Sequence, residues 1–357
     1  MAKNSNLNRA KDAKQDEFYT RREDIENELP HYAEHFKGKV VYCNCDDPVE
    51  SEFWQFFMRN FKSWGLKKLI ATHYEHDEKN YSYVLEICED TNGDGVVNYL
   101  DEPTMTQIPC NGDFRSGVCI EYLKEADIVV TNPPFSLFRE YMAQLMEYDK
   151  KFVIIGTINA VKYKEIFPLI MHDKIWTGFK PFSGGMDMIV PAKIFDPTKV
   201  KKYYIDSDGK AIVNIQGVCW FTNLDISKRH QILDLRGNYY SPEKYPKYDN
   251  FDGIDVSKVV DIPCDYDGLM GVPITFMDKY NPDQFEIIGV SNVNGLLDGV
   301  EEIGDKWVAD YKAAGGKGHI TAKMHSLVGY TNDGAPKAFY TRIVIRNKYP
   351  EERKYEN

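Results

Sequence analysis

Apolar residues follow two different spacings along the first half of the chain. Short continuous apolar runs, each with the length of a buried strand, lie at 39–44, 66–73, 127–131 and 151–157. Stretches with apolar residues at every third or fourth position, the spacing of an amphipathic helix, lie at 51–64, 137–148 and 162–171. Strands and helices that alternate with connections this short predict an α/β fold, with a doubly wound, Rossmann-like parallel sheet.

The pattern changes after Gly178. Strand-like runs bounded by turn residues follow at 185–191, 211–223, 285–290 and 340–346. Residues 239–252 are rich in Tyr, Pro, Asp and Asn, which is typical of a long loop or a domain boundary. We therefore expect two domains, an α/β domain over residues 1–235 and a smaller C-terminal region over residues 236–357.

Composition narrows the class of protein. The chain has 357 residues, of which 43% are hydrophobic, enough to bury a large core. No apolar run approaches the roughly 18 residues of a membrane span, and the first residues lack the apolar core of a signal peptide. We expect a cytoplasmic protein with reduced cysteines. Cys43 and Cys45 would point to opposite faces of a strand, so no zinc site is expected.

Charge is distributed unevenly. The formal net charge is −11, which opposes binding to the phosphates of a nucleic acid. Two segments are nevertheless basic: residues 1–22 have six basic and three acidic side chains, and residues 306–348 have eight basic and two acidic. These cationic side chains are either ordinary solvated groups or a local surface for a polyanion.

The motif with the most specific chemistry follows the apolar run at 127–131 and consists of Asn132, Pro133, Pro134 and Phe135. Two prolines in series cannot continue a strand because neither has an N–H, so Asn132 must lie at a strand's carboxyl end. Ligands bind at that edge of an open α/β sheet. The carbonyl oxygens of Asn132 and Pro133 suit an exocyclic NH2 group, and the Phe135 ring can stack on a heterocycle.

The motif and seven other segments together resemble the EcoRI-type adenine-specific DNA methyltransferases. The other segments lie in the family's order along nearly the whole chain. Three precede the motif, at 16–20, 46–54 and 112–115, and four follow it, at 184–191, 219–224, 271–276 and 285–289. The resemblance implies transfer of a methyl group from S-adenosylmethionine to the N6 amine of an adenine that is flipped out of double-stranded DNA. It also implies a monomer that acts in restriction–modification beside a separate endonuclease, or as an orphan modification enzyme.

The resemblance further implies a cofactor site. The residues that match the family's cofactor motifs are Tyr19, Thr20, Asp46, Asp47, Pro48, Ser51, Thr72, His73, Asp113 and Phe114. Asp113 would accept a hydrogen bond from the cofactor's adenine amine and Phe114 would stack on that adenine, although residues 111–113 also read as a plain turn. Thr20 could also cap a helix over residues 21–29, with Glu23 completing a capping box, and the two roles are compatible. Which residue of 71–75 holds the ribose stays open.

The surroundings of the flipped adenine are also implied by the resemblance. The flipped adenine would stack on Phe135, and Phe182 or Met186 is either its other wall or simple core. Charge, and not the resemblance, leads us to expect that Lys317, Lys323 and Lys337 of the basic C-terminal segment contact DNA; the alternative is a flexible surface loop without a partner. The alternatives to a DNA methyltransferase are an RNA or protein-glutamine methyltransferase, and a DNA-binding protein that keeps the scaffold without methylating.

One segment lies outside this scheme. Residues 90–101 carry oxygen side chains at loop positions 1, 3, 5, 9 and 12, and glycine at position 6, which is the spacing of an EF-hand calcium loop. However, Asp101 replaces the usual final Glu, and residues 81–88 have the pattern of a strand and not of a helix. We therefore favour a hairpin turn between two strands over calcium binding at Asp90–Asp101.

Overall fold

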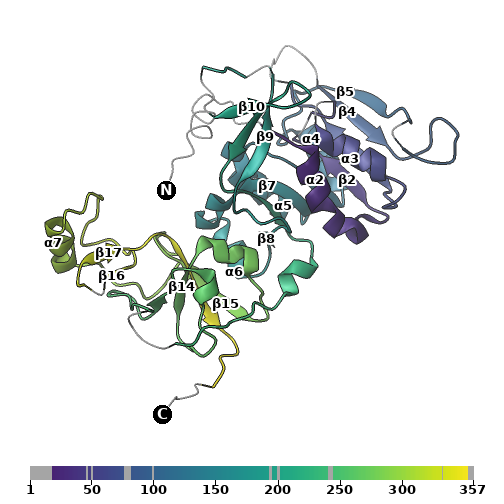
Figure 1. Cartoon of the computed structure of the whole chain (residues 1–357). Coiled ribbons are helices and arrows are strands. Elements are labelled where there is room, and N and C mark those ends of the chain that lie inside the picture. The colour runs from purple at the N-terminus through teal and green to yellow at the C-terminus, as the bar shows by residue number, and fades with distance from the viewer. Residues whose placement is uncertain are drawn as a thin grey trace. The chain divides into compact units, whose positions relative to one another are not determined.

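The computed structural model, drawn in Figure 1, forms two compact units. Unit 1 comprises the described residues up to Ala160 together with Ile175–Ile226, and unit 2 comprises Val161–Lys174 together with the described residues from Ser227 onward. The residues that the structure describes are 18–45, 47–49, 51–75, 82–98, 100–192, 195–198, 202–239, 244–331 and 333–352. Within these ranges, no helix has the length and apolar character needed to cross a membrane.

A mixed sheet of eight strands forms the centre of unit 1 (Figure 1). In spatial order its strands are β5 (Thr104–Ile108), β4 (Ser82–Ile87), β3 (Lys68–Thr72), β2 (Val40–Cys43), β6 (Ile128–Thr131), β7 (Lys151–Thr157), β12 (Val218–Thr222) and β8 (Trp176–Thr177). The four central strands β3, β2, β6 and β7 are parallel, and the strands outside them pair antiparallel. The α/β fold is therefore confirmed, but the sheet is parallel only at its centre.

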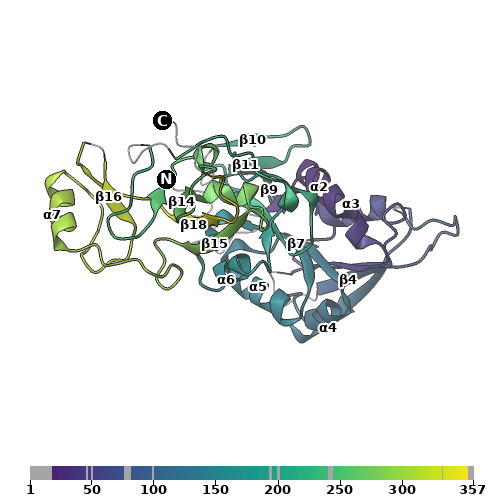
Figure 2. The ribbon, with the colours of Figure 1, turned by 90° about the horizontal axis from the view of Figure 1, so that it is seen from below.

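Helices cover both faces of this sheet (Figure 2). On one face lie α2 (Arg22–Glu28), the 3-10 helix η1 (Leu29–Phe36) and α3 (Glu52–Asn60), and on the other lie α4 (Gly117–Glu125) and α5 (Phe138–Glu147). Every residue of β2 and β6 is buried, which explains why their apolar runs are continuous and do not alternate with polar residues. Aromatic rings fill the core on the α3 side, where Phe36 contacts Phe57 and Trp64 with ring centroids 5.2 and 5.4 Å apart.

A second, antiparallel sheet of unit 1 brings the first described residues to a segment far along the chain. Its strands in spatial order are β1 (Tyr19–Thr20), β9 (Met186–Val190), β11 (Ala211–Ile215) and β10 (Tyr203–Ile205). Met186 and Met188 on β9 are buried in the core, whereas Asp187 between them lies on the opposite face, as the period of two of a strand requires. The sheet therefore has one apolar face and one polar face.

Several local predictions from the sequence are wrong. Thr20 does not cap a helix, because it lies in β1 and pairs with Met188, while Arg21 is the N-cap of α2 and makes no side-chain capping bond. The helix expected over 162–171 is reduced to α6 (Phe167–Met171), preceded by the 3-10 segment η3 (Ile158–Lys162). The run at 211–223 is not one strand, because it turns at Gly217 (φ +76°) and divides into β11 and β12 of different sheets.

The segment with calcium-loop spacing lies between two antiparallel strands, β4 and β5, so the predicted pairing of the flanking strands is confirmed. The connection covers residues 88–103 and is longer than a tight hairpin turn. Asp101 accepts hydrogen bonds from the backbone N–H groups of Asn98 and Thr91, both at 2.7 Å, and these bonds lower the pKa of its carboxyl group. Asp90 accepts in the same way from Gly93 (2.7 Å). The two carboxylates therefore hold the turn together. The described residues contain no group of three acidic, His or Cys side chains with the geometry of a metal site.

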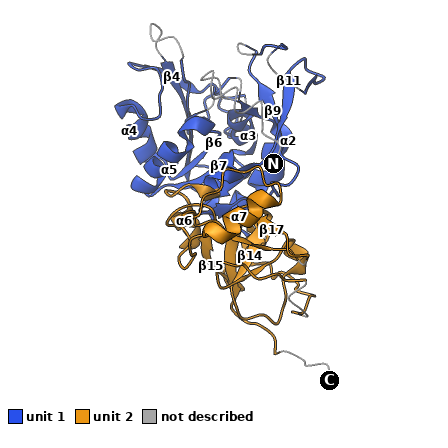
Figure 3. Ribbon diagram, turned by 90° about the vertical axis from the view of Figure 1, so that its left-hand side faces the viewer, with its two compact units in different colours: residues 1–160, 175–226 blue, residues 161–174, 227–357 orange. Residues whose placement is uncertain are grey.

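Unit 2, orange in Figure 3, is built mainly from short strands. One sheet has the order β13 (Ile254–Asp255), β14 (Met270–Pro273), β18 (Arg342–Asn347) and β15 (Phe285–Val290), and a smaller one joins β16 (Val328–Tyr330) to β17 (Pro336–Ala338). The buried carboxylate of Asp255 binds Arg342 (2.8 Å) and Tyr248 (3.0 Å) inside the first sheet. Helix α7 (Asp305–Ala313) packs its Trp307 into a separate small core with Val328.

The unit also contains α6 and three described 3-10 segments, which are η4 (Ser227–His230), η5 (Val259–Asp261) and η6 (Ile274–Lys279). The strands predicted at 285–290 and 340–346 correspond to β15 and β18.

Candidate active site

The carboxyl ends of β2 and β6 meet where the order of the parallel strands reverses. The chain continues from β2 toward β3 on one side and from β6 toward β7 on the other, so this is the switch point of the sheet. The backbone N–H of Cys45, just after β2, donates to the Thr131 hydroxyl at the end of β6 (3.1 Å). Asn44 and Asn132, which directly follow the two strands, therefore lie at the same edge of the sheet.

Asn132 lies where the two prolines predicted it, directly after β6, and only 7% of its surface is exposed. Its side-chain NH2 group donates a hydrogen bond to the backbone carbonyl of Phe18. Because the nitrogen end of the amide is the donor in this bond, the orientation of the acceptor oxygen is fixed. Pro133 is buried, and Phe135 opens the short 3-10 helix η2 (Phe135–Leu137).

Phe18 contacts both Asn132 and Phe135, which the sequence analysis did not predict. Its carbonyl anchors Asn132, and its ring stacks on that of Phe135, with centroids 6.3 Å apart and planes at 29°. The two rings and the Asn132 amide thus form one cluster beside the end of β6. Phe18 and Asn132 are 114 positions apart, so no local sequence signal could have shown this contact.

The sequence did not predict a role for a second asparagine, Asn44. Its side-chain oxygen accepts a hydrogen bond from the hydroxyl of Tyr141 on α5. Its NH2 group is buried and has no hydrogen-bond partner among the described residues. A buried donor without a partner costs free energy, on the order of 1–3 kcal/mol, unless a ligand or water satisfies it. Asn44 is therefore a candidate contact for a ligand that carries an acceptor group.

The loop between β2 and α3 contains four residues predicted to bind a cofactor. Ser51 caps α3 by accepting from the backbone N–H of Phe53 (3.2 Å), and its own N–H donates to the carbonyl of Asp47 (2.6 Å). Pro48 is buried within the loop. Asp46 lies outside the described residues. The cap gives Ser51 a structural role, whereas the Asp47 side chain turns toward the neighbouring strand.

The end of β3 meets that loop through His73. Its Nδ1 lies 2.9 Å from the Asp47 carboxylate and its Nε2 lies 3.8 Å from the Glu75 carboxylate. The His73 ring also stacks on Tyr83, with centroids 4.9 Å apart. Thr72 is placed differently, because it is fully buried and its hydroxyl bonds to Tyr42 (2.6 Å) inside the sheet. The structure thus brings the side chains of Asp47 and His73 together, whereas the side chain of Thr72 is directed to Tyr42.

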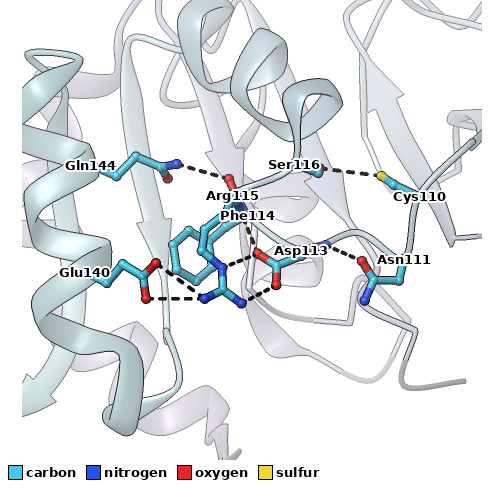
Figure 4. A network of polar contacts seen from close by, with 8 residues as sticks. All are labelled: Cys110, Asn111, Asp113, Phe114, Arg115, Ser116, Glu140 and Gln144. Atoms are coloured by element: carbon cyan, nitrogen blue, oxygen red, sulfur yellow. Dashed lines mark hydrogen bonds and ion pairs between the residues drawn. The ribbon is translucent and has the colours of Figure 1, made fainter. Parts of the chain in front are cut away.

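Asp113 and Phe114 belong to a polar network at the start of α4 (Figure 4). The Asp113 carboxylate accepts three hydrogen bonds from Arg115, of which the side-chain ones measure 2.9 and 2.6 Å. Arg115 also pairs with Glu140 on α5 (3.3 Å), and Gln144 donates to the carbonyl of Phe114 (3.2 Å). The Arg115 hydrogen bond holds the pKa of Asp113 below its ordinary value, so this carboxylate stays ionised at neutral pH.

The network leaves the Asp113 carboxylate able to accept a further hydrogen bond. Two of the three bonds go to Oδ1 and only one goes to Oδ2, and an ionised carboxylate oxygen has two acceptor sites. The ring of Phe114 is buried and meets Tyr141 edge-on, with centroids 5.0 Å apart. Since Tyr141 also binds Asn44, one side chain links the end of β2 to the Asp113 loop.

The Asp113 loop rests directly on the end of β3. Gly112 has a φ of +82°, and a Cβ atom placed there would overlap the carbonyl oxygen of His73 and lie 2.9 Å from the Ser82 hydroxyl. The carbonyl of Asn111 accepts from the backbone N–H of Glu75 (2.8 Å). Only glycine permits this approach, so Gly112 fixes the position of Asp113 relative to His73.

The three lysines predicted to bind DNA are all in unit 2. Lys317 is exposed in the glycine-rich loop after α7, and Lys323 is exposed in the segment that leads into β16. Lys337 lies in β17 with its ammonium group 4.6 Å from the centroid of the Phe339 ring.

Comparisons with known proteins agree with this geometry. The family model described as adenine-specific methyltransferase EcoRI matches residues 6–348. The type II methyltransferase M.EcoRI of Escherichia coli is 48% identical over 297 residues, which cover 80% of this chain and 89% of that protein. The type II methyltransferase M.MpnI of Mycoplasma pneumoniae is 42% identical over 347 residues, which cover 96% and 98%.

No solved structure matches the chain at a significant level. The family match nevertheless spans nearly the whole sequence. The chain therefore belongs to the EcoRI family of adenine-specific methyltransferases.

Proposed function

We propose that this protein is a site-specific DNA methyltransferase that transfers a methyl group from S-adenosylmethionine to the N6 amine of an adenine flipped out of double-stranded DNA. The observation that carries the proposal is the buried Asn132 amide at the switch point of the sheet, oriented by its hydrogen bond to the Phe18 carbonyl. Family membership supports the choice of adenine, and the carbonyl oxygens of Asn132 and Pro133 at this edge of the sheet support the N6 position.

Methyl transfer to the adenine amine requires two hydrogen-bond acceptors for its N–H groups and alignment of its nitrogen with the methyl group. The lone pair of an aromatic amine is delocalised into the ring, which makes the nitrogen planar and weakly nucleophilic. Hydrogen bonds from its two N–H groups to the Asn132 side-chain oxygen and the Pro133 carbonyl favour a pyramidal nitrogen. S-adenosylmethionine supplies an activated methyl group, so the protein's own task is to hold the amine in line with it and exclude water.

The adenine must leave the duplex to reach this site. The amine of a paired adenine is not accessible to Asn132, so the base must be flipped and stacked. Phe135 is half-buried and suits this stacking, and Phe18 supports it from the side. Met186 packs in the apolar core, which favours a structural role for it, and Phe182 is also buried.

The residues present suit S-adenosylmethionine. The unpartnered NH2 group of Asn44 would meet an acceptor such as the cofactor's carboxylate, and the hydroxyl of Thr20, also buried without a partner among the described residues, would bind the same end. Asp47 would interact with its positive charge. Glu75 and His73 at the end of β3 would hold the ribose in place of Thr72.

The adenine ring of the cofactor would lie at Asp113 and Phe114. Replacing Asp113 by alanine is expected to weaken S-adenosylmethionine binding by about 1–3 kcal/mol, because a buried amine would lose its acceptor. Isothermal titration calorimetry measures this directly. Replacing Arg115 by alanine is the matched control, since it breaks the same network but leaves the carboxylate. Equal losses in both variants, or no loss in either, would mean that Asp113 only shapes the turn.

An acidic protein needs a local basic surface to hold DNA. We propose that Lys317, Lys323 and Lys337 supply part of it, because they lie in the segment with the largest excess of positive charge. Changing all three to glutamine is expected to weaken DNA binding and to reduce its salt dependence by roughly one unit of slope per lost phosphate contact. Fluorescence anisotropy over a salt series measures both quantities.

The matched control changes three exposed lysines at the opposite edge of the unit 1 sheet, Lys62, Lys67 and Lys151. Lys151 begins β7 and Lys67 precedes β3, so both lie at the amino ends of strands, away from Asn132. The control variant has the same loss of charge and should keep the salt slope of the wild type. If the two triple variants behave alike, residues 306–348 do not form the DNA surface.

Two alternative functions use the same scaffold: methylation of RNA or of protein glutamine, and DNA binding without catalysis. An assay with purified protein and S-adenosylmethionine labelled in the methyl group distinguishes them, with duplex DNA, RNA and a protein substrate offered separately. We expect label in duplex DNA, recovered as N6-methyladenine after digestion. Label in RNA or protein alone, or binding without transfer, would contradict the proposal. We also propose a cytoplasmic monomer, with any cognate endonuclease a separate protein.

A further inference from the structure

The last turn of α7 and the segment that connects it to β16 carry basic side chains and no acidic ones (Figure 1). Residues 311–331 contain three lysines and two histidines but no Asp or Glu, although 55 of the 357 residues of the chain are acidic. All five of these lysine and histidine side chains are exposed. This part of unit 2 therefore offers a local surface for a polyanion on a protein that is acidic as a whole.

One side chain, Tyr311, holds the first part of this connection, which is rich in glycine. The Tyr311 ring stacks on that of Trp307, with centroids 5.1 Å apart and planes at 13°, and so belongs to the small core of α7. Its hydroxyl accepts from the backbone N–H of Gly318 (3.3 Å), and its backbone carbonyl accepts from that of Gly316 (2.9 Å). A Cβ atom at Gly316 would overlap the ring, so only glycine lets the chain pass this closely. Residues 314–325, named the Tyr311 loop here, are thus wrapped around this ring.

The second part of the Tyr311 loop is attached to the same core. Ala322 and Met324 pack against it, and their carbonyls accept from the backbone N–H groups of Gly304 and Ile303, both at 3.0 Å. Exposed side chains alternate with them at Thr321, Lys323 and His325. The loop is therefore tied to the fold on both sides of its tip.

The tip between these attachments presents two side chains, Lys317 and His319. Their neighbours Gly315, Gly316 and Gly318 have none, so the tip is narrow. The lysine ammonium group has only hydrogen-bond donors, and the histidine ring offers a donor N–H. The base edges in the grooves of DNA present acceptors, among them N7 of the purines, O6 of guanine and O4 of thymine. The tip is therefore complementary to the floor of a groove.

The fixed position of the tip favours contact with bases over contact with phosphates alone. Phosphates flank every base pair and carry no sequence information, so a mobile lysine is sufficient to bind them. A donor that reads a base edge must be held within about 0.5 Å of its correct position. The stacking of Tyr311 and its hydrogen bond to Gly318 supply such a framework.

We propose that the Tyr311 loop enters a groove of the DNA and reads base edges there, with His319 as the base contact and Tyr311 as the positioning residue that fixes the tip. Lys317 and Lys323 would bind phosphates on either side of His319. The proposal rests on the proposed function, and it extends that function by assigning part of the sequence recognition to a defined loop of unit 2.

Tyr311→Phe tests the positioning role, because it removes the hydroxyl that accepts from Gly318 and keeps the stacked ring. The Kd for duplex DNA that contains the motif methylated by the wild type is expected to rise about fivefold, the scale of one hydrogen bond. The Kd for unrelated duplex should change less. Fluorescence anisotropy measures both constants, and calorimetry should show unchanged binding of S-adenosylmethionine.

Tyr330→Phe is the matched control for this variant. Tyr330 packs on the same small core, but its hydroxyl donates to Asp310 on α7 (2.9 Å) and not to the loop. The control therefore loses a hydrogen bond of the same kind beside the same helix. It should bind both duplexes like the wild type. A role of Tyr311 in the stability of unit 2 alone would make the two variants behave alike.

His319→Ala tests the base contact. A duplex library with randomised bases around the target adenine is methylated, and the methylated molecules are sequenced. The variant is expected to relax the preference at one position of the motif by about 10-fold, the scale of one lost base contact. His172→Ala, which changes an exposed histidine of unit 2 at the C-cap of α6, is the control and should keep the wild-type preference.

Three results would overturn the proposal. They are a His319→Ala variant with the wild-type preference at every position, a His319→Ala variant with equal losses on all sequences, and Tyr311→Phe and Tyr330→Phe variants with the same DNA affinities. His319 is exposed, so its test stands even if Tyr311→Phe does not fold. If the wild-type enzyme methylates no duplex, the proposed function itself fails, and this inference with it.

Discussion

Replacing Asn132 by alanine is expected to lower the rate of methyl transfer by about 100- to 1000-fold, the loss typical of removing one preorganised polar group from a transition state. The side-chain oxygen that would accept from the adenine amine is removed, while β6 ends one residue earlier and keeps all its ladder bonds. Single-turnover kinetics with saturating DNA isolates this step from binding. The affinity for S-adenosylmethionine should stay close to that of the wild type.

Replacing Asn132 by aspartate separates the two ends of the amide. Aspartate keeps an acceptor for the amine but loses the NH2 group that donates to the Phe18 carbonyl, and two oxygens then face each other there. The rate of this variant should fall between those of the wild type and the alanine variant. An alanine variant that methylates DNA near the wild-type rate would show that Asn132 does not act on the amine.

Replacing Gly112 by alanine is expected to disrupt the cofactor site and to destabilise unit 1. A Cβ atom at this position overlaps the backbone carbonyl of His73, and a φ of +82° is strained for any residue with a side chain. The loop that carries Asp113 must therefore move away from the end of β3. We expect the melting temperature to fall and S-adenosylmethionine affinity to drop at least as much as in the Asp113→Ala variant.

Gly117, the first residue of α4, provides the control for this change. A Cβ atom added there would meet no other atom within 4 Å, and the backbone already has an ordinary helical conformation. Alanine at this position should leave binding intact and raise stability by up to about 1 kcal/mol, because alanine is the better helix former. If both alanine variants bind the cofactor alike, the Gly112 loop does not position Asp113.

The core strands of the fold were predictable because the residues that specify each strand are neighbours in the sequence. Strand β7 occupies the predicted residues Lys151–Thr157, and β15 occupies Phe285–Val290, since a continuous apolar run between turn residues has few other solutions. Asn132 was predictable for the same reason, because the two following prolines end the strand at a known place. Local sequence therefore predicted these strands and the residue at which β6 ends.

Other parts of the site depend on residues far apart in the chain. Thr20 has the local signature of a helix cap, yet pairing with Met188 draws it into a strand, and this long-range pairing outweighs a single capping bond. The anchoring of Asn132 by Phe18 and of Asn44 by Tyr141 joins residues 114 and 97 positions apart. Contacts of that separation follow from the assembled fold and have no signature in a single sequence.

The central claim, methylation of adenine N6 in DNA at the Asn132 site, is tested most directly by modification mapping. DNA from cells that express the wild-type chain, and from cells that express the Asn132→Ala variant, is read by single-molecule sequencing that detects modified bases. The account predicts N6-methyladenine in one short motif with the wild type and none with the variant. Absence of N6-methyladenine with the wild type, or the same methylated motif with the variant, would contradict it.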